Sequence, residues 1–531
     1  MRLRRHFLLF VLLCGGGNFV PTTGWLRIHQ YSLLHAGPSV STARSSAPPR
    51  PSLFFVPSRC RHPRRWNAMA ISYGSSTANT NTYYPRIDTT ENAIRDTDAL
   101  QSWATFACGI QQLDGLTFYR SSSSSSSSND DTNNDSNDDI AMATMVDITA
   151  GTCILYVPSM AVISATSVHR EFGRDLFEKP ENLLSNLLTT SSGSSSSSSS
   201  SSDQYTLFYL FFKLLIEYER GTGSDWYTYL NSLPRLYNTG ASLTPSCYDC
   251  LPPLAAKLCM EQRVRCINMR QALKTIPTDT LHEYVSVETL AKDELLKFIY
   301  NVIETRSVMV NDGKERILAP MVDMFNHASN GHEVELTYDV TSGDCYMHAI
   351  TNVPSGSMLH TSYGEYYRTN PSATFAKYGF IDTSCISSYC KMMNIIPSTE
   401  LRNIGLSYSR MLFYSDTGDV SEEVYDVILY QILSETSNWQ GQREFYTACI
   451  TNDTQLKSEY HATYIGQTMM KLKNHVDTFL KDLDDLYDKA RTKDLMKHPR
   501  LPLILAHNNY IRSTFMTVKD KIDPIIAQMM M

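Results

Sequence analysis

The chain has 531 residues, 42% of them hydrophobic, which is enough for two or three domains with full apolar cores. Residues 1–87 hold eleven Arg and no Lys, Asp or Glu, so the rest of the chain carries 36 basic and 54 acidic residues, a net charge of −18. An acidic body disfavours sequence-independent binding to nucleic acid and is compatible with a basic protein partner.

The first 87 residues are predicted to be a targeting presequence. Three Arg within the first five residues precede the apolar run 7–13, which has the order of a signal peptide and is too short to span a bilayer. The acid-free stretch that follows resembles a plastid transit peptide, and residues 17–21 are similar to the cleavage motif of bipartite plastid presequences. The alternative is that translation begins at Met69, which would leave a cytosolic or nuclear protein. No other uncharged run reaches spanning length, so we expect no stable membrane association.

Two low-complexity segments are predicted to be surface loops. Ser121–Ser128 leads into an Asn/Asp run that ends at Asp139, and Ser191–Ser202 is broken only by Gly193. Neither can bury enough apolar surface to offset the entropy lost on ordering. Between them, the alternation over residues 140–158 predicts two short strands.

The rest of the chain alternates between helical and strand character. Apolar residues at helical spacing predict helices over 207–218 and 290–303. Segments 333–340 and 345–351, separated by Thr-Ser-Gly-Asp, predict a β-hairpin. From residue 386 the pattern is helical, most clearly at 425–433 and 458–486. The order therefore indicates an α+β protein with a helical C-terminal part.

Three short blocks occur in a fixed order between residues 320 and 380. They are Pro320–His327 (PMVDMFNH), Thr361–Gly364 (TSYG) and, after Asn370, Tyr378–Phe380 (YGF). Their order and spacing resemble the C-terminal signature of SET-domain protein methyltransferases. The subgroup is the one typified by the Rubisco large-subunit lysine methyltransferase, which also includes the actin-histidine methyltransferase.

That resemblance implies a domain organisation and a cofactor. Residues 88–385 would form a SET domain, with strands at about 140–158 and 317–380 and a helical insert at about 165–310. Residues 386–531 would form an all-α substrate-binding domain. The implied reaction transfers a methyl group from S-adenosylmethionine to a protein side chain.

The same resemblance assigns roles to individual residues. Tyr363 stands where the family places a catalytic phenol, and Asn326 and His327 stand where it contacts the cofactor. Arg306 and Asp323 would line the substrate pocket. Methyl transfer is an in-line displacement that needs a neutral amine in a dry channel, and a phenol at the channel mouth can orient that amine.

Two positions around the last block differ from the family pattern. Tyr378 would be a second aromatic of the substrate pocket. However, Pro371 follows Asn370 where a small helix former is usual, and one extra residue separates Asn370 from Tyr363. The geometry at Tyr378 is therefore less constrained by the pattern than that at Tyr363.

The front of the predicted domain departs from the family more strongly. The family has a Gly-x-Gly segment there, which lets the backbone approach the cofactor. The matching cofactor segment here, Asp139, Ile140 and Ala141, has no Gly. An alternative alignment uses Gly109, in Cys108–Ile110. The first alignment suggests weak cofactor binding or an inactive relative.

Metal binding is the less favoured interpretation of two clusters. The cysteines 247, 250, 259 and 266 lack the short second spacing of a zinc ribbon. Asp323, His327 and His332 lie close together in sequence without a clear fourth ligand. We expect no metal.

The sequence therefore favours a monomeric protein-lysine methyltransferase that uses S-adenosylmethionine and acts on a protein substrate. Two alternatives remain open: a histidine methyltransferase, and a catalytically inactive module that keeps the fold to bind proteins.

Overall fold

The computed structural model describes residues 84–120, 140–190, 201–389, 395, 397–407 and 409–530, and the statements below concern these residues. The predicted presequence lies outside this range except for residues 84–87. Ser121–Ser128 and Asp139 lie outside the described range, and so do residues 191–200 of the second serine-rich run.

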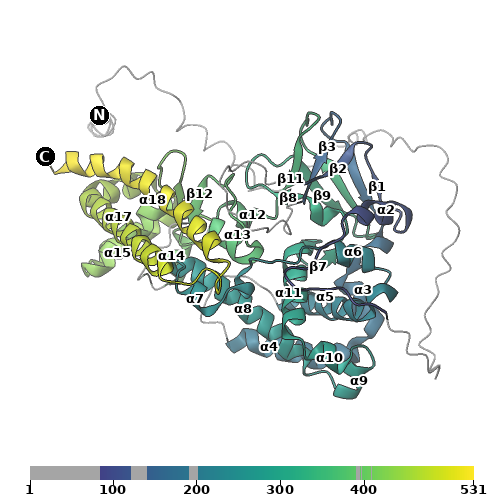
Figure 1. Cartoon of the computed structure of the whole chain (residues 1–531). Coiled ribbons are helices and arrows are strands. Elements are labelled where there is room, and N and C mark those ends of the chain that lie inside the picture. The colour runs from purple at the N-terminus through teal and green to yellow at the C-terminus, as the bar shows by residue number, and fades with distance from the viewer. Residues whose placement is uncertain are drawn as a thin grey trace, which may run out of the picture. The chain divides into compact units, whose positions relative to one another are not determined.

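A mixed eight-stranded sheet forms the first layer of the fold (Figure 1). Its strands are β1 (Gln111–Gln112), β2 (Leu116–Arg120), β3 (Ile140–Thr144), β4 (Cys153–Val157), β8 (Asn326–His327), β9 (Val334–Tyr338), β10 (Cys345–Ala349) and β11 (Met358–Thr361). The spatial order is β1-β4-β10-β9-β11-β3-β2, with β8 beside β11. The pairing of β8 with β11 is parallel, His360 opposite Asn326 and Thr361 opposite His327.

Helices form the second layer and fill most of the chain between β4 and β8. They are α3 (Ala165–Phe172), α4 (Arg174–Thr190), α5 (Ser201–Arg220), α6 (Tyr227–Ser232), α7 (Pro245–Tyr248), α8 (Pro253–Leu273), α9 (Thr278–His282), α10 (Val287–Leu290) and α11 (Asp293–Arg306), preceded by α2 (Asp98–Phe106). A small antiparallel sheet of β5 (Ile163–Ser164), β7 (Glu315–Leu318) and β6 (Val308–Val310) packs against α3 and α5.

Helix α5 is central because it is apolar on nearly every side. Leu207, Leu210, Phe211, Leu214 and Leu215 have no exposed surface, so this helix is surrounded by other elements rather than lying on the surface. The side chains of α3, α5 and α11 share one hydrophobic core with those of β3, β4, β9 and β10. The sheet and the helices are therefore held together by one apolar interior.

The C-terminal part is helical, as predicted, apart from a two-stranded sheet of β12 (Ser387–Tyr389) and β13 (Leu412–Tyr414). It follows α12 (Glu365–Arg368) and α13 (Pro371–Tyr378) and contains α14 (Thr399–Asn403), α15 (Glu422–Glu435), α16 (Trp439–Thr451), α17 (Thr454–Arg491) and α18 (Leu501–Met529). These helices have their own core, and α17 and α18 run side by side (yellow-green and yellow in Figure 1). No described helix is long and apolar enough to cross a membrane.

The structure confirms the α+β class and most of the predicted elements. The predicted hairpin is β9 and β10, which pair antiparallel. The two strands predicted within 140–158 are β3 and β4, but they do not pair with each other. Instead, β3 lies between β2 and β11, whereas β4 lies between β1 and β10.

Candidate active site

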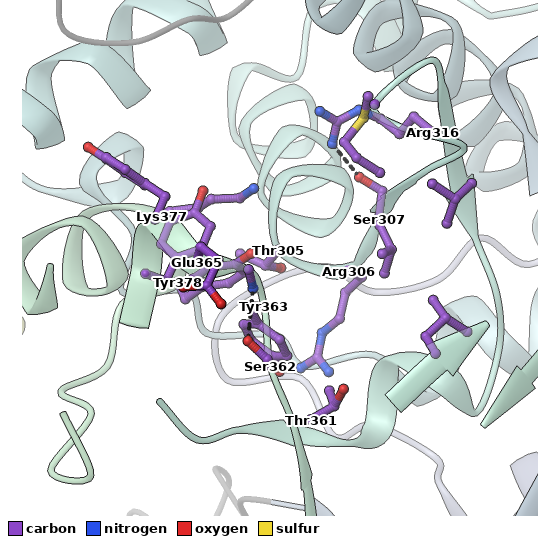
Figure 2. A pocket seen from close by; sticks show the side chains of 18 of the residues that line it. Thr305, Arg306, Ser307, Arg316, Thr361, Ser362, Tyr363, Glu365, Lys377 and Tyr378 are labelled. Carbon is purple, nitrogen blue, oxygen red and sulfur yellow. Dashed lines mark hydrogen bonds between the residues drawn. The ribbon is translucent and has the colours of Figure 1, made fainter. Parts of the chain in front are cut away.

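A cavity of about 1390 Å³ opens beside the ends of α11 and α13 (Figure 2). Four of the predicted site residues contribute to its wall: Arg306, Asp323, Tyr363 and Tyr378. They come from α11, the 3₁₀ turn Val322–Met324, the segment after β11, and α13. Residues far apart in the sequence thus meet at one cavity.

Tyr363 is held by the segment that contains Asn326 and His327. Its phenol donates a hydrogen bond to the carbonyl oxygen of Phe325 (3.0 Å), and its backbone N–H donates to Nδ1 of His327 (3.1 Å). The two rings stack with their centres 4.9 Å apart. Burial raises the pKa of the phenol to about 12, so at neutral pH Tyr363 is a protonated hydrogen-bonding group and not a base.

His327 is a buried imidazole whose Nδ1 faces two backbone groups, the Tyr363 N–H (3.1 Å) and the Thr361 carbonyl oxygen (3.3 Å). Because the shorter contact is to a donor, Nδ1 is assigned as the acceptor and the proton to Nε2, which lies 3.2 Å from Oγ of Ser329 and 3.5 Å from a carboxylate oxygen of Asp382. Burial lowers the pKa of His327, and the Asp382 charge opposes this only in part. His327 therefore orients the backbone of Tyr363 while its own ring is oriented by Ser329 and Asp382.

Asp382 completes this arrangement from the segment after the Tyr-Gly-Phe block. Its carboxylate accepts hydrogen bonds from the backbone N–H groups of Ser329 (3.0 Å) and Ser384 (2.8 Å) and from the Ser384 hydroxyl (2.6 Å). Burial raises the pKa of this carboxyl, but these hydrogen bonds outweigh the effect and the pKa is lowered overall. Asp382 is thus a charged partner for the Nε2 side of His327.

Tyr378 reaches the cavity because α13 is capped at both ends. The Asn370 side chain accepts the backbone N–H of Ala373 (3.2 Å), and Pro371 occupies the first helical position, where its missing N–H costs nothing. Gly379 ends the helix with φ +79°, and a Cβ there would lie 2.5 Å from the Asn238 backbone. The ring centre of Tyr378 is then 4.7 Å from that of Tyr363. Pro371, a departure from the family pattern, suits its position.

Arg306 and Asp323 form a polar pair next to Tyr363. Nη1 of Arg306 donates to the backbone carbonyl of Asp323 (2.7 Å), and the hydroxyl of Tyr229 donates to Oδ2 of Asp323 (3.0 Å). Burial raises the pKa of Asp323 to about 6, against the effect of Arg306 and the Tyr229 hydrogen bond. Among the described residues, Oδ1 of Asp323 and Nε of Arg306 have no hydrogen-bond partner. These two atoms can therefore form hydrogen bonds with a polar group of a bound ligand.

Of the predicted front segment, the described residues Ile140 and Ala141 do not contribute to this wall. Asp139 lies outside the described residues, and Ile140 and Ala141 begin β3, where Ala141 is buried opposite Tyr119. Gly109 of the alternative alignment has φ +69° and open space where a Cβ would stand, so its glycine suits the turn after α2. Asn326 and His327 also lie outside the cavity lining, directly behind Tyr363.

The described part of the chain has no arrangement of side chains that would support either metal-binding interpretation. No group of three or more His, Cys, Asp or Glu side chains there could hold a metal ion. Cysteines 247, 250, 259 and 266 are buried with free thiols. His332 lies on the cavity wall, whereas the His327 ring is bonded to Ser329 and Tyr363.

Sequence reasoning missed several residues that the structure adds to the site. Tyr229, Tyr367, Lys377 and Asp382 lie within or directly behind the wall described above. Lys377 and Asp382 flank the Tyr-Gly-Phe block, which was a usable signal. Tyr229 begins the segment Tyr229–Pro234, which resembles the helical insert of the SET subgroup, but that resemblance gave Tyr229 no role at the site.

No protein-family model and no curated protein matches this chain. Among solved structures it is similar to Rubisco LSMT bound to AdoMet, with 11% identity and a TM-score of 0.47, over 82% of this chain and 93% of that one. It is also similar to Rubisco LSMT bound to sinefungin and monomethyllysine, with 13% identity and a TM-score of 0.48 over the same shares. A third similar structure is the SET domain of LSMT bound to lysine and AdoHcy, with 12% identity, a TM-score of 0.47, and 82% and 92% covered. At these identities and TM-scores the similarity assigns no chemistry to individual residues.

Proposed function

We propose that this protein is an S-adenosylmethionine-dependent protein N-methyltransferase and that its acceptor is a lysine side chain. The observation that carries the proposal is the set of contacts around Tyr363. Its phenol and its backbone N–H are hydrogen-bonded to Phe325 and His327, so contacts across 38 and 36 residues of sequence join two motif blocks into one unit beside a cavity.

The residues present fit the proposed cofactor at its polar groups. An amino-acid head group carries one carboxylate and one ammonium, which the guanidinium of Arg306 and the carboxylate of Asp323 could bind; this differs from the family resemblance, which places both residues on the substrate side of the pocket. The unpartnered Nε of Arg306 and Oδ1 of Asp323 support this match. The side-chain amide of half-buried Asn326 makes no hydrogen bond to any described residue and is a candidate for further polar contact.

When bound, S-adenosylmethionine supplies an electrophilic methyl group on a sulfonium sulfur. The chain must then hold a neutral amine in line and exclude water. Because the Tyr363 hydroxyl hydrogen is directed to the Phe325 carbonyl, its oxygen keeps lone pairs that can accept a hydrogen bond from the incoming amine. The rings of Tyr363 and Tyr378 give that amine an apolar, weakly hydrating wall, which favours its neutral form.

Calorimetric titration with S-adenosylmethionine tests the proposal. We expect the wild-type protein to bind, and Asn326→Ala to bind at least tenfold more weakly. Asn326 is the informative position because its side chain makes no hydrogen bond to any described residue, whereas His327→Ala also removes a buried ring. Normal binding by Asn326→Ala would contradict the cofactor assignment, and no binding by the wild type would favour the inactive protein-binding module.

Two further questions need their own experiments: whether the acceptor is lysine or histidine, and whether the protein is located in plastids. Mass spectrometry of methylated peptides from cells that lack this protein would distinguish a lysine acceptor from a histidine acceptor.

The proposed plastid location rests only on the composition of residues 1–87. A fluorescent protein fused after residue 87 should enter plastids, and a cytosolic or nuclear signal would favour a start at Met69.

A further inference from the structure

A cluster of charged side chains lies at the α13 side of the cavity, next to Tyr378. We call it the ionic cluster; its members are Asp203, Arg265, Glu304, Arg316 and Lys377. Four of them line the cavity, and Glu304 lies immediately behind it. The members come from α5, α8, α11, β7 and α13, so the fold brings them together from across the chain.

The two arginines of the ionic cluster are already matched by its two acids. Arg265 donates to Asp203 (2.7 Å) and to Glu304 (3.0 Å). Arg316 donates to the other oxygen of Asp203 and, as Figure 2 shows, to the hydroxyl of Ser307 (2.7 Å). Glu261, which α8 also places on the cavity wall, pairs with Lys257. With three cations and two acids, the ionic cluster carries one surplus positive charge. The Lys377 ammonium also attracts Asp203, but it is the cation of the cluster that makes no hydrogen bond to either acid.

A surplus charge in a poorly hydrated place is costly unless another group compensates it. The Lys377 side chain is 14% exposed, and its Nζ lies 3.8 Å from Glu304, beyond hydrogen-bond distance. Nζ also lies over the rings of Tyr378 (5.1 Å from the ring centre) and Tyr367 (5.4 Å). It makes no hydrogen bond to any described residue, so its three donors are open to a group that enters the cavity.

We propose that Lys377, supported by the ionic cluster, is a subsite for a carboxylate of the protein substrate, an Asp or Glu side chain close in sequence to the methylated residue. This deepens the proposed function and rests on it. The ring centre of Tyr378 is 4.7 Å from that of Tyr363 and 5.1 Å from Nζ of Lys377, so the ammonium lies at most about 10 Å from the Tyr363 ring. An extended chain covers about 3.3–3.6 Å per residue, which places the acidic residue within about three positions of the acceptor.

The competing explanation is that Lys377 only compensates Glu304, which is 1% exposed. Glu304 already accepts a hydrogen bond from Arg265, and its ion pair with Lys377 is the longer of the two. If compensation were the whole role, loss of the Lys377 charge would change stability and leave ligand preference unaltered.

The test uses binding of labelled peptides to the full-length protein by fluorescence anisotropy at low salt. Each peptide has one central lysine in an alanine and glycine background, with Glu or isosteric Gln at one of the three positions on either side. We expect the wild type to bind the best Glu peptide about tenfold more tightly than its Gln counterpart. Lys377→Gln should lose this preference, Lys377→Arg should keep most of it, and Lys377→Glu should prefer a peptide with Arg at the same position.

Lys274→Gln is the matched control, because it makes the same charge change at an exposed position that is not on the cavity wall. Equal binding of Glu and Gln peptides by the wild type, or a preference that survives in Lys377→Gln, would overturn the proposal. Absence of peptide binding at any position would overturn it as well. The assay needs no methyl donor, so a protein that fails to bind S-adenosylmethionine but selects acidic peptides would refute the proposed methyltransferase and retain the subsite.

Discussion

At the scale of single residues, Tyr363 is the position on which the proposed chemistry depends most. Its hydroxyl is directed by the Phe325 carbonyl and stays protonated at neutral pH, because burial raises its pKa to about 12. A phenol held in this way can act on the transition state through the lone pairs of its oxygen.

Tyr363→Phe should therefore lower kcat about 100-fold or more, with S-adenosylmethionine affinity nearly unchanged. The ring and its stacking on His327 are retained in this variant, so the binding site should keep its shape. Single-turnover kinetics and calorimetry measure the two effects. Tyr119→Phe, on the exposed side of β2, is the matched control; equal turnover in both variants would remove Tyr363 from the mechanism.

Asp323 predicts an acid limb in the pH profile. Its pKa is raised to about 6, mainly by burial, so below pH 6 the carboxylate becomes neutral and loses its attraction for a bound cation. We expect kcat/KM to fall about tenfold per pH unit below 6. Asp323→Asn should be less active at pH 8 and should lack this limb. An unchanged acid limb in the Asn variant would show that another group titrates there.

At the scale of the elements, the sequence predicted the helices and strands whose own residues show a clear apolar pattern. The β9–β10 hairpin has alternating burial on both strands and a Gly in its turn, and α5 has an apolar run long enough for a buried helix. The pairing of β8 with β11 involves only two residues on each strand, and β1 has two residues in all. Elements this short have no periodicity from which they could be predicted, and their partners are set by tertiary contacts.

The difference between local pattern and tertiary contact also explains which site residues could be predicted from the sequence. Arg306, Asp323, Tyr363 and Tyr378 were identified through the family resemblance and meet at one cavity. Tyr229 and Asp382 act on the site through a single hydrogen bond or ion pair that crosses a long stretch of sequence. Such contacts leave no trace in composition or spacing.

Helix α18 supports α13 through a buried histidine. Nε2 of His507 lies 3.1 Å from the hydroxyl of Ser372, and its ring lies 4.6 Å from that of Phe375. His507 is fully buried, and burial lowers its pKa to about 4. The imidazole is thus neutral in the folded protein at pH values where an unfolded chain already binds a proton.

This shift predicts weaker folding in acid. Because the folded pKa is depressed, the stabilisation is present above the unfolded pKa of 6.5 and is lost as the pH falls towards 4. The loss should reach about 3 kcal/mol. In His507→Gln, whose side chain does not titrate, urea unfolding at a series of pH values should show a smaller decrease between pH 6.5 and 4. Identical slopes in the variant and the wild type would contradict the assignment.

At the scale of the whole molecule, the C-terminal helices share a core with the region that carries the cavity. Leu501 and Ile504 of α18 pack in one cluster with apolar residues of α8 and with Phe375 of α13. A region used only to dock substrate would not need to bury these side chains against the cavity-bearing helices. The packing therefore supports α13 and, through it, Tyr378, whether or not residues 386–531 also dock the substrate as proposed.

Ile504→Ala tests this support of α13 without removing the region. Ile504 has no exposed surface, so the cavity left behind should lower the unfolding free energy by about 2–5 kcal/mol. Ile450→Ala, at a half-exposed position of α16, is the control and should change it little. If α18 positions α13, Ile504→Ala should also lower kcat for a short lysine peptide, since Tyr378 loses support even without a large substrate to dock. A destabilised variant that still turns over the peptide at the wild-type rate would mean that the C-terminal helices stabilise the fold and bind substrate without controlling the geometry around Tyr363.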